Sequence, residues 1–358
     1  MKKIITTGLS AMLLLTVFHK EAVSQQPQPH PKPKVSHHNY NGDFDGHLPG
    51  TWDAVVKDGE VNIQFFGEHW SDGRDFTTVE LGTLPADKVG EFSLTRESGK
   101  LNFKGVFQDH WGHGTYQFNE NPAFKSYLAQ KGYKGLDNEL MLNIFFTDIS
   151  KGYFDYLKAN GYPSISNGQL ADLAQQNLTH KVLEDYFNLF KTEGYSHQSI
   201  DKIVELREHG VDARFVNSFH HAGYKNIPLD KALELRDHGV NVEFITSIQK
   251  MGYEKVSLDR AQELRDHGVN PEFIADMQNI GYKDISLEKA QELRDHGVNP
   301  EFIKSINELG FKDISLDQAQ ELRDHGVNAS FIKKAQSKGM NLHTLDDYIK
   351  LRDTGFND

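Results

Sequence analysis

Histidine flanked by charged residues recurs in this chain and is the first candidate for chemistry. The motif Arg-(Asp/Glu)-His-Gly-Val occurs five times. Imidazole binds transition metals and serves as a general acid or base, so such a cluster suits a metal site or a catalytic site. The motif residues are Arg207, His209, Gly210, Arg236, His238, Gly239, Arg265, His267, Gly268, Arg294, His296, Gly297, Arg323, His325 and Gly326.

The spacing of these motifs favours a structural role instead. The five arginines follow one another at a constant step of 29 residues. Equivalent positions in stacked helical units lie at least ~8 to 10 Å apart, whereas zinc holds its nitrogen ligands at about 2.0 to 2.1 Å. One ion therefore does not reach two of the histidines, and a repeat does not supply the different, converging groups that catalysis needs.

We therefore predict that each histidine lies in the last turn of a helix. There it can hydrogen-bond terminal carbonyls and, when charged, complement the helix dipole. Its Arg and Asp neighbours are expected to pair with the next unit. Ligand binding along this ladder of residues is the alternative.

Two acid-His-Trp stretches form the second candidate. They are "GEHWSDGRD" at 67–75 and "QDHWGHG" at 108–114. If the two stretches lie side by side, their histidines and acids suit a metal and their tryptophans can stack on a sugar. The alternative is that the tryptophans cap a β core and the polar residues belong to solvated hairpin loops. The candidate residues are His69, His110 and His113 for a metal, and Trp70, Trp111, Glu68 and Asp109 for a ligand.

The elements around these stretches are predicted to be short antiparallel strands. Alternating segments occur at 51–56, 60–66, 75–81, 91–97, 100–108 and 114–120, and Asp58-Gly59 is a strong hairpin signal between the first two. One face is expected to be apolar through residues such as Phe92, Leu94, Phe103 and Phe107. We predict a small antiparallel β domain over residues 49–120.

The remainder, 121–358, is predicted to be a helical repeat array. A glycine followed by Tyr, Phe or Met recurs every 29 residues from Gly132 to Gly339, except for a step of 33 between Gly161 and Gly194. "NPAFKSYLAQKGY" at 121–133 matches "NPEFIKSINELGF" at 299–311, which places the start of the array at about residue 121. His180 is expected to be in register with His209.

One unit, 286–314, is predicted to be a helix, a tight turn and a second helix. Ser286 and Asn299 suit helix N-caps, Pro300 suits a first helical position, and Gly297 and Gly310 suit helix ends. Helices of about ten residues are too short to be stable alone, so the units must bury apolar faces against one another. The expected core residues are Leu287, Ala290, Leu293, Val298, Phe302, Ile303 and Ile306. The fold class is thus α+β, a small antiparallel β domain followed by an α-solenoid of roughly 29-residue helix-turn-helix repeats.

The N-terminal residues favour export. Lys2 and Lys3 precede an apolar run to Phe18, and Ala22-Val23-Ser24 fits a cleavage site, so residues 1–24 are predicted to be a signal peptide. A disordered Pro/Gln/His-rich linker is expected over 25–48. We predict a secreted or periplasmic protein with no stable membrane insertion after signal removal.

Composition excludes several classes of function. With no cysteine, the chain forms no disulfide and has no thiol chemistry, and its formal net charge of −12 disfavours nucleic acid as a partner. The motifs HExxH and GxSxG and a phosphate-binding loop are absent from the sequence. We therefore expect no cofactor and no metal.

The stretches "EFSLTRESGKLNFKGVFQDHWGHGTYQFNENPAF" (91–124) and "LRDHGVNPEFIKSINELGFKDIS" (293–315) carry a resemblance. Together they are similar to exported proteins of Bacteroidetes-like bacteria that join a small β domain to "HGVxPEFIxxLxxLGY" repeats. Such repeats also occur in extracytoplasmic parts of antirepressor-type membrane metallopeptidases. The zinc motif and transmembrane bundle of those peptidases are missing, so the resemblance implies an envelope recognition or scaffolding part without protease activity.

We accordingly predict a non-enzymatic, exported protein-interaction or scaffold protein. Its partner is expected to be a protein or peptide of the cell envelope, bound through a repeat surface that varies at positions such as Ile248, Met277 and Ile306. The alternative is a glycan- or metal-binding envelope module that uses the two His-Trp loops. A third hypothesis, an envelope hydrolase, requires convergent carboxylates or histidines around those loops.

Overall fold

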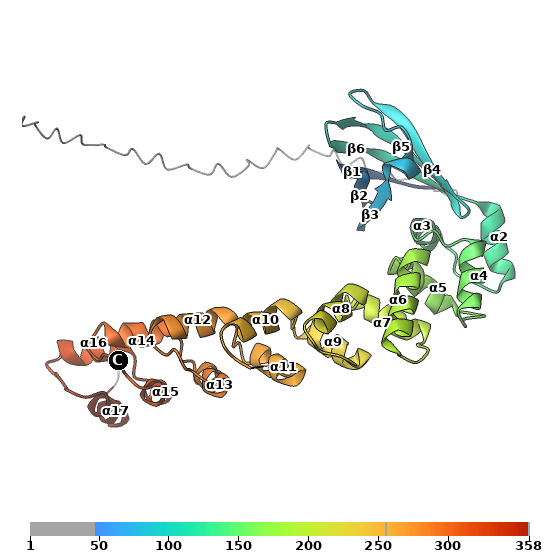
Figure 1. Cartoon of the computed structure of the whole chain (residues 1–358). Coiled ribbons are helices and arrows are strands. Elements are labelled where there is room, and N and C mark those ends of the chain that lie inside the picture. Colours follow the sequence, from blue (N-terminus) through green and yellow to red (C-terminus); the bar gives the residue numbers. More distant parts are fainter. Residues whose placement is uncertain (1–46, 255, 357–358) are drawn as a thin grey trace, which may run out of the picture. The chain divides into compact units, whose positions relative to one another are not determined.

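The computed structural model describes residues 47–254 and 256–356. The predicted signal peptide at 1–24, and the predicted linker at 25–48 apart from its last two residues, lie outside this range. Within it, strands come first and helices follow (Figure 1). No helix among the described residues combines the length and the apolar character that crossing a membrane requires.

Six strands form one antiparallel sheet in the order β3-β2-β1-β6-β5-β4. Asp58 and Gly59 have φ values of 52° and 85° and form the turn between the first two strands. β1 and β6 lie at the centre, so the sheet joins the N-terminal and C-terminal hairpins. The strands are β1 (His47–Lys57), β2 (Glu60–Phe66), β3 (Ser71–Thr77), β4 (Gly90–Arg96), β5 (Gly99–Gln108) and β6 (Trp111–Glu120).

The third strand differs from its prediction. It begins earlier than expected, at Ser71, and ends at Thr77, where the short helix α1 (Thr78–Leu81) takes over. The Thr77 side chain accepts a hydrogen bond from the Glu80 backbone N–H at 3.1 Å, and the Glu80 carboxylate accepts one from the Thr77 N–H at 2.9 Å. This capping box starts a helix despite the strand-favouring Thr and Val residues.

One face of the sheet is buried, and a helix of the array closes it. Phe92, Leu94, Phe103 and Phe107 are buried as expected. The ring of Phe146, at the end of α3 (Asn138–Phe146), lies 4.7 Å from that of Phe65 on β2, and the Phe145 ring lies 5.3 Å from Phe118 on β6. The predicted boundary at residues 120/121 separates strands from helices, but a single core spans it.

The helices after β6 alternate between two layers, as Figure 1 shows for α9 to α17. We call the odd-numbered helices, which end at the Arg-Asp-His-Gly motif or its equivalent, A helices, and the even-numbered ones B helices. Their bounds are α2 (Pro122–Gln130), α3 (Asn138–Phe146), α4 (Lys151–Ala159), α5 (Asn167–Gln175), α6 (His180–Glu193), α7 (Ile200–Glu208), α8 (Ala213–His221), α9 (Leu229–Asp237), α10 (Val242–Lys250), α11 (Leu258–Asp266), α12 (Pro271–Asn279), α13 (Leu287–Asp295), α14 (Pro300–Asn307), α15 (Leu316–Asp324), α16 (Ala329–Ser337) and α17 (Leu345–Asp353).

The predicted unit at 286–314 has the expected caps. Ser286 accepts a hydrogen bond from the Lys289 N–H at 3.0 Å, and Asn299 accepts one from the Phe302 N–H at 2.8 Å. Gly297 has a φ of 71°, in the left-handed region where glycine is favoured. Six of the seven expected core residues are buried; Leu287 is half-buried against the same core.

The predicted register of His180 is wrong. His180 is the first residue of α6, a B helix that is longer than its neighbours, whereas the residue equivalent to His209 is Gln176, the C-cap of α5. Asn177, with a φ of 50°, takes the place of the glycine. The insertion lies within α6, so the constant repeat step does not hold across this helix.

Candidate functional site

The five motif histidines join successive repeat units. Each is the C-cap residue of an A helix, and its Nδ1 lies within hydrogen-bond distance of the Asp carboxylate at the end of the next A helix. The expected hydrogen bonds to terminal carbonyls are replaced by these ion-pair contacts. The pairs are His209–Asp237 at 2.5 Å, His238–Asp266, His267–Asp295 and His296–Asp324 at 2.6 Å, and His325–Asp353 at 2.8 Å.

The carboxylate partner affects the protonation of the histidines at the two ends of this ladder. The hydrogen bond that His209 donates to the Asp237 carboxylate raises the pKa of His209 above its ordinary value of 6.5, and nearby Glu205 and Glu208 act in the same direction. The hydrogen bond from His325 to the Asp353 carboxylate raises the pKa of His325 in the same way. Because these rings are solvent-accessible and each is paired with a carboxylate, they act as contacts between units.

The motif arginines are also used between units. The guanidiniums of Arg236, Arg265, Arg294 and Arg323, and that of Arg352 in α17, each lie over a Phe ring in the B helix of the preceding unit, which is a cation–π contact. Arg207 instead donates a hydrogen bond from its Nε to the backbone carbonyl of Gln176 at 3.1 Å. The Arg294 guanidinium also lies close to the motif glycine of the preceding unit, since a Cβ on Gly268 would lie 2.8 Å from Arg294 Nη2. The distances to the ring centroids are 5.2 Å for Arg236–Phe215, 5.3 Å for Arg265–Phe244, 5.2 Å for Arg294–Phe273, 4.4 Å for Arg323–Phe302 and 5.0 Å for Arg352–Phe331.

Two further sets of contacts repeat along the array, and sequence reasoning did not identify them. The Tyr that follows the recurrent glycine donates a hydrogen bond from its hydroxyl to a backbone carbonyl in the next unit. Tyr253 donates to Ile285 O and Tyr282 to Ile314 O, both at 2.6 Å. A Lys near the start of an A helix pairs with an acid of the next one, as Lys289 does with Asp317 at 2.6 Å. The charges of the A layer are thus largely used inside the array.

The two His-Trp loops do not form one site. The turn at 67–70 follows Phe66, which pairs with Thr51 of β1, whereas the turn at 109–110 precedes Trp111, which pairs with Val55. The turns therefore extend from opposite ends of β1, and their nearest strand residues are already about 13 Å apart at ~3.3 Å per residue. In the range that the structure describes, no three His, Asp or Glu side chains gather as a metal site would require.

The individual loop residues have separate environments. Glu68 and His69 are highly exposed, and their side chains lie 3.7 Å apart. The Trp70 indole lies so close to Gly67 that a Cβ there would clash with its ring, so this ring belongs to its own turn. Asp109 has a φ of 53° and forms the turn with His110.

Trp111 is the exception among the tryptophans, with 56% of its surface exposed. It shares the outer face of the sheet with His113, the next residue but one along β6. The His110 ring lies 5.4 Å from the Trp111 ring. The structure therefore separates Trp111 and His113 from the residues around Trp70.

The outward face of the B helices differs from the A layer in two respects. The residues at helix positions 2, 5, 6 and 9 lie on one face, because they follow the spacing i, i+3, i+4, i+7, and none is buried. We call this surface the B stripe. It consists of Arg214, Asn217, Ser218 and His221 of α8; Glu243, Thr246, Ser247 and Lys250 of α10; Glu272, Ala275, Asp276 and Asn279 of α12; Glu301, Lys304 and Ser305 of α14 with its C-cap residue Glu308; and Ser330, Lys333, Lys334 and Ser337 of α16.

The B stripe is variable and its charges are mostly free of ion pairs. The A helices from α9 to α15 read LDKALELRD, LDRAQELRD, LEKAQELRD and LDQAQELRD, whereas the stripe changes its residue types at every helix. Among the described ion pairs, Arg214 is the only stripe residue that takes part, and its partner is Asp212, its own helix cap. Since successive B helices from α10 to α16 pack against one another, the stripe is continuous over them.

The prediction that the variable positions Ile248, Met277 and Ile306 lie on the binding surface is wrong. Ile248, Met277 and Ile306 have no exposed surface and lie in the core between the layers. These positions vary because Ile and Met are similar in volume and both fit a buried site. The exposed variation lies instead on the neighbouring residues of the same helices, in the B stripe.

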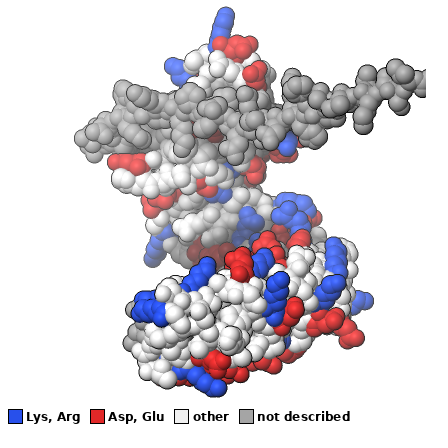
Figure 2. Space-filling model, turned by 90° about the vertical axis from the view of Figure 1, so that its left-hand side faces the viewer, with Lys and Arg blue, Asp and Glu red and all other residues white. Residues whose placement is uncertain are grey.

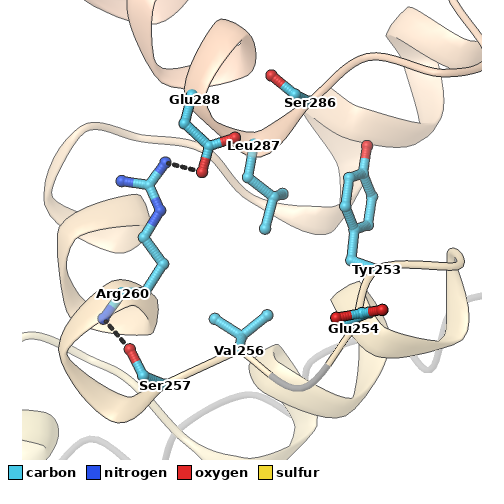
Figure 3. Close-up of a pocket in the computed structure, with 8 residues that line it drawn as sticks. All are labelled: Tyr253, Glu254, Val256, Ser257, Arg260, Ser286, Leu287 and Glu288. Carbon is cyan, nitrogen blue, oxygen red and sulfur yellow. Dashed lines mark hydrogen bonds and ion pairs between the residues drawn. The ribbon is translucent and has the colours of Figure 1, made fainter.

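Shallow grooves lie between units at the other ends of the A helices. One, of about 390 Å³, lies between the loop after α10 and the start of α13, and Figure 3 shows its apolar floor of Val256 and Leu287. Tyr133 and Ser166 line a second groove at the equivalent place near the start of the array. The Tyr253 hydroxyl in the first groove is already bonded to the backbone. The Arg260 guanidinium of the same groove pairs with Glu288 at 3.7 Å, so polar groups that line it already have partners within the chain.

Comparison with known proteins adds no further information, because no family model, curated protein or solved structure matches the chain.

Proposed function

We propose that this protein is a non-enzymatic, exported interaction or scaffold protein that binds a protein or peptide of the cell envelope through the B stripe. The supporting observation is the contrast between the two layers. Charges of the A layer pair with the next unit, whereas those of the B stripe are exposed, variable and largely free of ion pairs. Charged side chains that form few ion pairs within the described part of the chain are available to a partner.

The dimensions of the B stripe suit an extended segment. Packed helices lie about 8 to 10 Å apart, so the four helices α10 to α16, over which the stripe is continuous, extend over roughly 24 to 30 Å. An extended chain advances about 3.3 Å per residue, so a segment of roughly seven to nine residues would follow this part of the stripe. Mixed polar and small residues there favour specific hydrogen bonds and ion pairs over a purely apolar interface.

A steric block of the B stripe tests this proposal. Ala275→Trp and Ser247→Trp place a large ring on half-buried stripe positions. Ser93→Trp, at an exposed position of β4 on the sheet, is the matched control. The full chain and its variants, each tagged, are used to capture proteins from envelope extracts for quantitative mass spectrometry. We expect the proteins held by the wild type and by Ser93→Trp to fall at least about tenfold with the stripe variants; equal capture by all four proteins contradicts the proposal.

Glycan binding is a second candidate, favoured by the exposure of Trp111. An indole on a polar sheet face can stack on the apolar face of a sugar ring, with His113 beside it as a hydrogen-bonding group. Trp111→Ala should then abolish retention on envelope polysaccharide, whereas Trp70→Ala should leave it unchanged because that ring packs on its own turn. This candidate is removed if the wild type is not retained on the polysaccharide, or if Trp111→Ala is retained as well as the wild type.

A further inference from the structure

We infer that the partner segment is bipolar, with acidic residues that bind at α16 and basic residues that bind at α12. This inference rests on the proposed function, since it assigns the chemistry of the segment that occupies the B stripe. It follows from the distribution of charge along the stripe, which changes sign between these two helices.

The C-terminal end of the stripe is basic. Lys333 and Lys334 lie on α16, and Lys304 holds the position on α14 that is equivalent to Lys333. Where α14 carries Glu301 and Glu308, α16 carries serines, so its part of the stripe holds no acidic residue. No described ion pair neutralises these three lysines. Figure 2 looks on to this end of the chain and shows a broad uncharged area with both basic and acidic side chains around it.

The α12 part of the stripe is acidic. Glu272 and Asp276 are exposed, and the other two stripe residues of this helix, Ala275 and Asn279, are uncharged. Neither carboxylate takes part in a described ion pair, in contrast to Asp266 and Asp295 at the ends of the neighbouring A helices. In a chain with a net charge of −12, a few unpaired lysines gathered at one end and unpaired acids two helices away form a distinct dipole.

The separation of the two charged regions fixes the spacing in the partner. Two helix-packing steps separate α12 from α16, which amounts to about 16 to 20 Å. An extended peptide covers that distance in roughly five to six residues. Exposed ion pairs contribute little individually, so complementary charge of this kind sets the orientation and the rate of association more than the affinity. The partner is thus an extended segment in which an acidic cluster and a basic cluster lie about six residues apart.

Charge reversal with synthetic peptides tests the inference. The probe is a fluorescein-labelled peptide with three Asp and three Lys residues in two blocks whose centres lie six positions apart. A peptide of the same composition with alternating Asp and Lys is its control. In fluorescence anisotropy with the full chain at low salt, we expect the block peptide to bind about tenfold more tightly than the alternating one.

The variants separate this inference from non-specific charge effects. Lys333→Glu with Lys334→Glu should weaken binding of the block peptide about tenfold, and adding Glu272→Lys with Asp276→Lys should restore it, because the peptide can bind in the opposite direction. Lys100→Glu with Lys104→Glu, exposed on the sheet, is a control with the same change in net charge. The bipolar inference is overturned if the two peptides bind equally well, or if the variant with all four charge reversals does not regain binding of the block peptide. Such a result leaves the steric test of the B stripe unaffected.

Discussion

Arg96 connects the sheet to the helical array, and its replacement should destabilise both. Its Nη1 donates hydrogen bonds to the backbone carbonyls of Phe145 at 2.6 Å and Phe146 at 2.8 Å, at the end of α3. Its Nη2 donates to Glu80 at 3.2 Å, and the guanidinium lies 5.4 Å from the Phe145 ring centroid. One side chain from β4 therefore caps the helix that completes the core of the sheet.

The expected magnitude for Arg96→Met follows from these contacts. A hydrogen bond to a charged group contributes about 1.5 to 3 kcal/mol, and the side chain is largely buried, with 13% exposed. Losing two such bonds predicts a loss of about 3 to 5 kcal/mol in the free energy of unfolding. The Phe145 carbonyl keeps its hydrogen bond from the Asp148 N–H at 3.1 Å. The Met side chain keeps much of the packing, so the change acts mainly through hydrogen bonds and charge.

The tryptophan distribution gives a direct assay. All three tryptophans, Trp52, Trp70 and Trp111, lie in the sheet region, so their fluorescence reports on the sheet, while far-ultraviolet circular dichroism reports mainly on the helices. In urea unfolding at an m value of about 1 to 3 kcal/mol/M, the fluorescence midpoint of Arg96→Met should fall by roughly 1 to 5 M.

Two variants complete this test. Arg96→Lys keeps the charge without the planar fork, so we expect an intermediate loss of stability. Arg294→Met removes a cation–π contact far along the array, 5.2 Å from Phe273, and should leave the fluorescence midpoint unchanged. A fluorescence transition that is the same in Arg96→Met and the wild type would show that the sheet folds without α3, and would refute the single core.

Three further variants test the contacts between units. In an NMR titration the pKa of His209 should lie above 6.5 and return toward that value in Asp237→Asn. Because the pKa is raised in the folded state, the pair stabilises the fold fully below pH 6.5, and this stabilisation is lost as the pH rises through the folded-state pKa. Identical titration curves for the wild type and the variant would argue against the pair. Gly297→Ala and Gly268→Ala should each cost about 1 to 2 kcal/mol in thermal or urea unfolding, because both residues have a positive φ that alanine disfavours. An unchanged free energy of unfolding in either variant would contradict this. Tyr282→Phe removes a hydrogen bond to the next unit and should lower the unfolding free energy by about 1 to 3 kcal/mol, and an unchanged value would show that the bond contributes nothing.

The helices of the array are predictable from the sequence because their signals are local. The caps at Ser286 and Asn299 and the left-handed Gly297 lie close to the helix ends that they define. The constant period of the motif then supplies the fold class, since units too small to be stable alone must stack. The strand predicted at 75–81 is wrong at its end, because the capping box at Thr77 and Glu80 is as local a signal as strand propensity and outweighs it there.

The candidate site depended on contacts that no local pattern specifies. The partner of His209 lies in the next repeat unit, and the opposite placement of the two His-Trp loops follows from the pairing of β1 with both β2 and β6. Register across a sheet and side-chain pairing between units are set by packing. The sequence spacing therefore identified the repeated histidines but not the aspartates with which they pair.

The near-identity of the A layer has a physical cause that bears on function. A residue such as Asp295 ends its own helix and also accepts a hydrogen bond from His267 of the preceding unit, so a substitution there disturbs two units at once. Arg294 likewise belongs to one unit and lies on the Phe ring of another. The outward residues of a B helix carry no such double role. A repeat protein built in this way can alter its B stripe at Lys304 or Asp276 with little effect on stacking, and specificity for a partner is expected to reside where the array tolerates that change.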